Sequence, residues 1–239
     1  LWSPRLMNES PSYPIGALAS NSGRALWLRF GRESTVNRSD PVLHVLPIDE
    51  IRPTQMTLGL LEVVEKRKAW RAAKTKDRNK LLTEHVAPGV IGPKGWFYVV
   101  DHHHLIRALH EEDAPGVFVQ ILADFSKLDS EEFWINLDHR KWAHPYDEDG
   151  RRADFAYMPK HIADLKDDPY RSLAGAVRRA GGFAKDLTPY AEFLWATFFR
   201  SRIEQDDLIG EFEDSVAHAV TLARSNAAGH LPGWCGVKD

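Results

Sequence analysis

The chain has 239 residues, of which 43% are hydrophobic and 27% charged, a composition typical of a globular protein with one or two domains. Its formal net charge of −3 gives no global reason to expect nucleic-acid or membrane binding, so any basic surface must be local. The single cysteine, Cys235, excludes an intrachain disulfide and a zinc site of the Cys₂His₂ or Cys₄ type. Because no apolar run reaches about 18 residues and no signal peptide is visible, we expect a cytoplasmic protein, or an exported form whose leader has been removed.

Residues 1–40 are rich in Ser, Asn, Pro and Gly, which predicts an extended N-terminal arm. A short β-type run over 42–47 opens the compact region, and the prolines of the next segment are expected to end any regular element. Apolar residues at helical spacing then predict helices over about 60–73 and about 75–86, the second of which Pro88 stops.

The most basic part of the chain lies within these two helices. Between Lys66 and Lys80 there are eight Lys or Arg residues and one acidic residue, Asp77. A charge run on a helix is usually a solvated face, and contact with phosphate groups is the alternative.

Five bulky β-formers over 96–100 predict a buried strand, which is followed by a helix closing near Glu112 and a strand over 117–122. The region 41–126 is therefore expected to be an α+β domain. Residues 127–239 are expected to form a mainly α-helical C-terminal domain, since capping residues and apolar spacing recur along them. Its helices are predicted from about 130, and over roughly 170–180, 188–203 and 208–225.

The chemistry of the chain is concentrated where the second strand meets the third helix, at Asp101, His102, His103 and His104. Backbone N–H groups in the first turn of a helix have no intrahelical partner, and the helix dipole is positive there. Such a terminus attracts phosphate oxygens, to which imidazole donors and the planar fork of Arg107 would add hydrogen bonds.

Two other interpretations stand beside phosphate binding. Adjacent histidines suggest a metal, but successive side chains on a helix point about 100° apart and cannot all ligate one ion. Alternatively, Asp101 only caps the helix, and the histidines pack and form local hydrogen bonds.

The chain resembles the ParB/sulfiredoxin superfamily, specifically its branch of ParB-like nucleases. The resemblance implies a small mixed sheet with helices, followed by a mainly helical region, and nucleotide phosphates bound at the start of the helix after the second strand. The segments that carry it are 46–55, 98–109, 167–174 and 191–196.

The superfamily places a motif of the Asp-Gly-His-His-Arg or Gly-Glu-Arg-Arg type at this helix start. Asp101, His103 and His104 match the first form, and Arg107 matches the end of the second. His102 replaces the glycine, so a positive φ there would be strained, and Leu105 replaces an expected arginine.

Two further departures concern activity. Sulfiredoxins carry a reactive cysteine within the motif, and its absence here excludes sulfinic acid repair. The serine kinases of the superfamily use a glutamate as general base near the position of Gln55, whose amide cannot act as a base.

We therefore expect a protein that binds a nucleotide or another phosphate-containing small molecule, with ATP or CTP and Mg²⁺ as cofactors, acting as a phosphotransferase or nucleotide hydrolase. The alternatives are a nuclease or DNA-binding module, against which the acidic pI and the missing helix-turn-helix pattern argue, and a non-enzymatic ligand-binding scaffold. No membrane partner, no protein metal site and no particular oligomeric state is indicated. The catalytic residues expected are Asp101, His103 and His104, and the phosphate contacts expected are His102, His103, His104, Arg107, Thr54 and Gln55.

Overall fold

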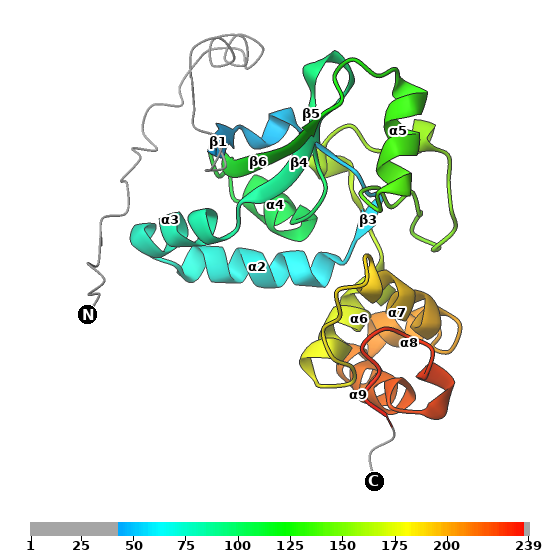
Figure 1. Cartoon of the computed structure of the whole chain (residues 1–239). Helices are drawn as coiled ribbons and strands as arrows, with labels where there is room; N and C mark the ends of the chain where they lie inside the picture. Colours follow the sequence, from blue (N-terminus) through cyan, green and yellow to red (C-terminus); the bar gives the residue numbers. More distant parts are fainter. Residues whose placement is uncertain (1–42, 237–239) are drawn as a thin grey trace, which may run out of the picture. The chain divides into compact units, whose positions relative to one another are not determined.

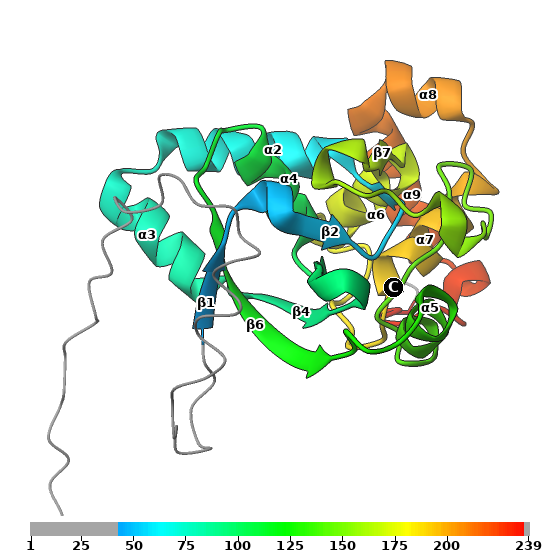
Figure 2. The same ribbon diagram turned by 90° about the horizontal axis from the view of Figure 1, so that it is seen from above.

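The computed structural model describes residues 43–236, so the predicted N-terminal arm over 1–40 lies outside the described residues. The described residues belong to one compact unit. Five strands form a curled mixed sheet in the order β1-β6-β4-β5-β2, and two further strands, β3 and β7, pair separately (Figures 1 and 2). The strands are β1 (Leu43–Leu46), β2 (Ile51–Pro53), β3 (Thr57–Leu58), β4 (Ala87–Ile91), β5 (Phe97–Val99), β6 (Val117–Asp124) and β7 (Lys166–Asp167).

The β4–β5 and β1–β6 pairs are antiparallel, whereas β4–β6 and β2–β5 are parallel. Helices α2 and α4 pack against each other beneath this sheet in the view of Figure 1. The helices are α2 (Leu60–Ala72), α3 (Thr75–Glu84), α4 (His103–His110), α5 (Ser130–His139), α6 (Pro169–Arg179), α7 (Ala191–Arg200), α8 (Gln205–Gly210) and α9 (Phe212–Ala223). The predicted α+β class with a helical C-terminal region is confirmed.

Strands β2, β3, β4 and β7 were not predicted from the sequence, and in β2 and β4 the reason is a proline. In β2, Pro53 is tolerated because the strand lies at the edge of the sheet. Strand β4 is central, and its Pro88 and Gly89 resemble a helix stop rather than a strand. The Pro88 carbonyl still accepts the Val100 N–H at 2.9 Å, and the ring of Phe97 occupies the space that a side chain at position 89 would need.

The helical half was predicted more closely, because its capping residues act locally. Asp168 caps α6 by accepting the N–H groups of Tyr170 and Arg171 at 3.0 and 3.2 Å, and Pro169 occupies the first turn. The predicted final helix is divided into α8 and α9, which is a correction of the expectation for 208–225.

Apolar clusters stabilise these elements within the described part of the chain. One lies between the sheet and α5, where Val90 and Tyr98 pack on Phe133 and Leu137. Another is formed by α6, α7 and α9 around Trp195, which is fully buried. The two halves of the chain also contact each other, since the Leu61 N–H on α2 donates to Ser172 Oγ on α6 at 3.2 Å. The predicted domain boundary at 126–127 stays a prediction.

Candidate functional site

The junction between β5 and α4 has an unusual backbone. Strand β5 ends at Val99 and α4 begins at His103, with His102 as the residue before the helix. His102 has φ 67° and ψ 19°, which is the left-handed conformation that favours glycine. The Asp101 carboxylate accepts the His102 N–H at 2.6 Å and so supports this turn. The strain anticipated for a histidine at the glycine position of the motif is therefore present.

The rings of His103 and His104 act as hydrogen-bond acceptors inside the protein. His103 Nε2 accepts the Thr54 N–H at 3.2 Å, and His104 Nε2 accepts the Gly59 N–H at 3.0 Å. Burial lowers the pKa of His103 to about 4, and burial together with the charge of Arg171 holds the pKa of His104 well below its ordinary value. Both imidazoles are therefore neutral, and they fasten the two ends of the 54–59 segment to α4.

Thr54 and Gln55 are likewise engaged within the protein. The Thr54 hydroxyl donates to the Val99 carbonyl at 2.8 Å, and the Gln55 amide donates to the Thr57 carbonyl at 2.9 Å. The structure thus brings these two residues next to His103, as the resemblance implied, but their polar atoms face protein groups. Their roles in phosphate binding stay predictions.

Arg107 lies farther along α4 and serves a different segment. Its Nη1 donates to the carbonyls of Ile162, Ala163 and Leu165 at 3.2, 2.8 and 3.1 Å, and its Nε donates to Glu111 at 2.7 Å. The guanidinium therefore holds the 162–165 segment against α4. As a phosphate contact it would have to give up these partners.

One lysine of the basic window faces the junction. Lys66 is exposed on α2, and its charge lowers the pKa of both His102 and His104, after the larger effect of burial. Two arginines of the same window are already paired, since Arg67 and Arg71 form ion pairs with Glu112 at 2.6 and 2.7 Å. Lys66 is consequently the cation of this window that is placed to meet an anion at the start of α4.

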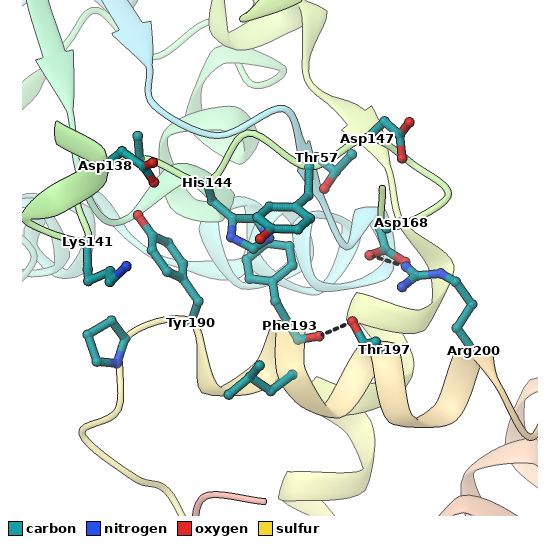
Figure 3. Close-up of a pocket in the computed structure, with 15 residues that line it drawn as sticks. Thr57, Asp138, Lys141, His144, Asp147, Asp168, Tyr190, Phe193, Thr197 and Arg200 are labelled. Atoms are coloured by element: carbon teal, nitrogen blue, oxygen red, sulfur yellow. Dashed lines mark hydrogen bonds and ion pairs between the residues drawn. The ribbon is translucent and has the colours of Figure 1, made fainter. Parts of the chain in front are cut away.

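A pocket of about 410 Å³ lies beside the junction, and the sequence analysis did not find it (Figure 3). Its walls come from the end of α5 and the loop that follows, from Thr57 and Asp168, and from the loop and helix that begin near Pro189. Its lining residues are Thr57, Asp138, Lys141, Ala143, His144, Tyr146, Asp147, Gly150, Asp168, Pro189, Tyr190, Phe193, Leu194, Thr197 and Arg200. The aromatic and polar turn over 144–150 was the one local signal that could have indicated it.

Electrostatic effects show that the pocket adjoins the junction. Burial raises the pKa of Tyr190, and the carboxylates of Asp101 and Asp138 raise it further. Burial lowers the pKa of His144 to about 3, with smaller effects from Arg171 and His103. Asp101 is thus close enough to shift the pKa of Tyr190 in the pocket wall. His103 is close enough to shift the pKa of His144 in the same wall.

Backbone strain is concentrated at the same place. Among the described residues, five that are not glycine have positive φ, and three of these are His102, Lys141 and Tyr190, with φ of 67°, 58° and 60°. Such conformations cost on the order of 1–3 kcal/mol each and cluster at functional sites. The junction and the pocket are therefore best regarded as one candidate site.

In residues 43–236, no three side chains of His, Cys, Asp or Glu converge on a position that could hold a metal ion. Within the same range, no helix combines the length and the apolar character that crossing a bilayer requires.

A curled mixed sheet, with a strand that leads through a strained turn into a helix beside a pocket, defines an α+β protein with a candidate ligand site at a strand–helix junction. The family model described as "Putative ParB-like nuclease" matches residues 44–201. The chain therefore belongs to this ParB-like family. Among solved structures it is similar to the crystal structure of protein Atu1540 from Agrobacterium tumefaciens, with 47% identity, a TM-score of 0.79, and 84% of this chain and 100% of that chain covered. No curated protein matches the chain.

Proposed function

We propose that this ParB-like protein binds a nucleotide, ATP or CTP with Mg²⁺, through its phosphates at the start of α4. The observation that carries the proposal is the set of backbone donors there. The hydrogen-bond ladder of α4 begins with the Ile106 N–H, which donates to the His102 carbonyl at 3.0 Å. The N–H groups of His103, His104 and Leu105 precede it and have no partner within the helix. Three aligned donors at the positive end of a helix favour phosphate oxygens.

Nearby charges support an anionic ligand. Lys66 supplies a cation whose charge acts on His102, and the partly buried His102 ring lies 5.8 Å from that of His85, centroid to centroid. The pKa of His102 is lowered chiefly by burial and further by the charges of His85 and Lys66. A bound phosphate would counter these positive charges and would favour protonation of His102.

The residues present also fit a magnesium ion that arrives with the nucleotide. Mg²⁺ is usually held by one or two carboxylates together with substrate phosphates, and it neutralises the charge on those phosphates. The Asp101 side chain is exposed at the junction, and its Oδ1 accepts the His102 N–H. Its second oxygen is the atom we assign to the ion.

The test is calorimetry with ATP and CTP in the presence of Mg²⁺. Lys66→Glu is expected to weaken binding about tenfold or more, because a charged contact contributes on the order of 1.5–3 kcal/mol. Lys68→Glu is the matched control, since Lys68 is also an exposed lysine of α2, and it should change the Kd less than about twofold. If neither nucleotide binds the wild-type protein at millimolar concentration, the proposal is wrong.

The description of the family favours a second candidate, a nuclease or DNA-binding protein. Besides Lys66, exposed lysines lie on α2 (Lys68), at the residue before α3 (Lys74) and on α3 (Lys76), and they could contact a nucleic-acid backbone. Nicking of supercoiled plasmid that is abolished in Asp101→Asn would support this candidate. A gel shift that is unaffected by salt, or absent at micromolar protein, would count against it, because phosphate contacts make binding salt-dependent.

A further inference from the structure

The pocket contains an aromatic wall that the phosphate proposal leaves unexplained. The ring of His144 lies between those of Tyr146 and Phe193, with centroid distances of 4.5 and 4.0 Å, and the ring of Tyr190 lies 4.6 Å away (Figure 3). These four rings come from two segments of the chain, the loop after α5 and the start of α7. Such a surface suits the face of a planar ring, because aromatic pairs prefer centroids about 4.5–7 Å apart.

The pocket also contains an unpaired polar atom. Thr57 is 1% exposed, and its Oγ1 is buried without a hydrogen-bond partner, although the residue lines the pocket. A buried hydroxyl left unpaired costs about 1–3 kcal/mol, so its retention calls for a partner that is not part of the protein. Arg200, at the other end of the wall, has an unpaired Nε as well, while its Nη2 binds Asp168 at 2.7 Å.

The remaining features of the pocket define the size and chemistry of a ligand. A volume of about 410 Å³ falls in the usual range of small-molecule sites, roughly 300–1,000 Å³. The neutral His144 ring has one donor and one acceptor nitrogen, so it can pair with either kind of group on the edge of a heterocycle. Lys141 and Tyr190 adopt their strained conformations at the pocket wall.

We propose that this pocket binds a hydrogen-bonding heteroaromatic ring of the nucleobase class, stacked on the aromatic wall with its edge toward Thr57 and His144. The inference rests on the proposed function in one respect, namely that the ring belongs to the nucleotide whose phosphates bind at α4. The pocket and the junction adjoin, since the His144 N–H donates to the Thr54 carbonyl at 2.8 Å and the Thr54 N–H donates to His103 Nε2 at 3.2 Å. One nucleotide could therefore occupy both.

Binding of the four common nucleosides, which lack phosphate, tests the pocket separately from the junction. Saturation-transfer NMR and calorimetry on the full chain should detect at least one nucleoside. Thr57→Val should weaken nucleoside binding roughly 3- to 10-fold without lowering the Tm, because the substitution removes an unpaired hydroxyl and keeps the shape of the side chain. A hydroxyl with only a structural role would leave nucleoside binding unchanged.

A second pair of variants tests occupancy of the pocket. Thr197→Trp should abolish nucleoside binding, since Thr197 lines the pocket from α7 and is exposed there. Thr221→Trp is the matched control, because both threonines are exposed on helices and donate to the carbonyl four residues earlier, at 3.0 and 3.3 Å. The Thr221→Trp variant should bind nucleosides with the affinity of the wild type.

Inorganic tripolyphosphate separates failure of this inference from failure of the proposed function. If tripolyphosphate binds with sensitivity to Lys66→Glu but no nucleoside binds, the base pocket is wrong and the phosphate site stands. If a nucleoside binds and tripolyphosphate does not, the pocket stands without the phosphate site. Nucleoside binding that survives Thr197→Trp overturns the assignment of this pocket.

Discussion

At the scale of single residues, His102 lies in the candidate site and has an unfavourable backbone conformation. An L-residue in the left-handed region is less stable there than glycine by roughly 1–2 kcal/mol. The Asp-Gly-His-His-Arg motif that this segment resembles has glycine at this position, whereas the present chain has an imidazole on a left-handed backbone. The ring lies edge-on to His85, and the charge of Asp101 acts on it. This arrangement suggests that the imidazole is retained for the ligand rather than for the fold.

The substitution His102→Gly separates these two roles. We expect the free energy of unfolding to rise by about 1 kcal/mol, because the strain is relieved, and nucleotide affinity to fall. Chemical denaturation and calorimetry measure the two effects. Asp113→Gly is the control, since Asp113 also has positive φ, at 50°, in the turn after α4. It should leave affinity unchanged. A loss of stability in His102→Gly would show that the contact with His85 outweighs the strain.

The sequence predicts the position of the histidines but not the direction of their side chains. The histidine motif located the junction, because a buried strand followed by a polar helix start is a local pattern. It did not show that His103 and His104 face inward. Their orientation is set by the N–H groups of Thr54 and Gly59, which lie more than forty residues earlier, and no local pattern records such a contact.

At the scale of elements, Arg107 connects α4 to a segment of the helical half. Its guanidinium donates to three carbonyls at the 3₁₀ turn Ile162–Asp164 and at Leu165, which supplements the few backbone hydrogen bonds of this short turn. Strands β3 and β7 pair immediately beside it, with Leu58 opposite Asp167. The position of this segment therefore depends on one side chain of α4.

Arg107→Ala should lower the free energy of unfolding by about 2–3 kcal/mol, because hydrogen bonds to a charged group contribute about 1.5–3 kcal/mol and several carbonyls lose their donor. Amide hydrogen exchange should accelerate over 162–165. In contrast, Arg71→Ala removes an exposed ion pair with Glu112 and should cost less than about 1 kcal/mol. Equal effects of the two substitutions would contradict the role assigned to Arg107.

The elements that could be predicted are those whose signals are local. Helices α2, α3 and α6 follow from apolar spacing and caps, and β5 follows from its run of bulky residues. Strand β4 could not be predicted, because its pairing with β5 and β6 overrides the preference of Pro88 and Gly89 for a turn. The pocket is still harder to predict from the sequence, since the residues that line it are spread along the chain from Thr57 to Arg200.

At the scale of the whole molecule, buried neutral histidines make stability depend on pH. Burial lowers the pKa of His103 to about 4 and that of His144 to about 3, from an ordinary value near 6.5. The unfolded chain therefore binds more protons than the folded chain below about pH 6.5, and stability falls as the pH decreases toward these values. His104, whose pKa is also lowered by burial, acts in the same direction.

We expect urea midpoints to decrease markedly between about pH 7 and about pH 5, since one pKa unit corresponds to about 1.4 kcal/mol. His144→Phe keeps an aromatic ring in the cluster and removes one of these titrations, so its unfolding free energy should vary less with pH than that of the wild type. His218→Phe is the control, because it replaces a histidine that is exposed on α9. A pH dependence identical in His144→Phe and the wild type would show that the pKa of His144 is not lowered by folding.

The strand order has a consequence for how the chain reaches its native state. Among the neighbouring strands of the described sheet, β4 and β5 alone are joined by a short connection. Strand β1 pairs with the distant β6, from Leu46 opposite Val117, and β2 pairs with β5 across two helices. Long loops must close before these ladders gain any hydrogen bonds, and such non-local topologies fold slowly. The helices of the C-terminal half have no such requirement. We therefore expect them to form first and the sheet to be the rate-limiting event in folding.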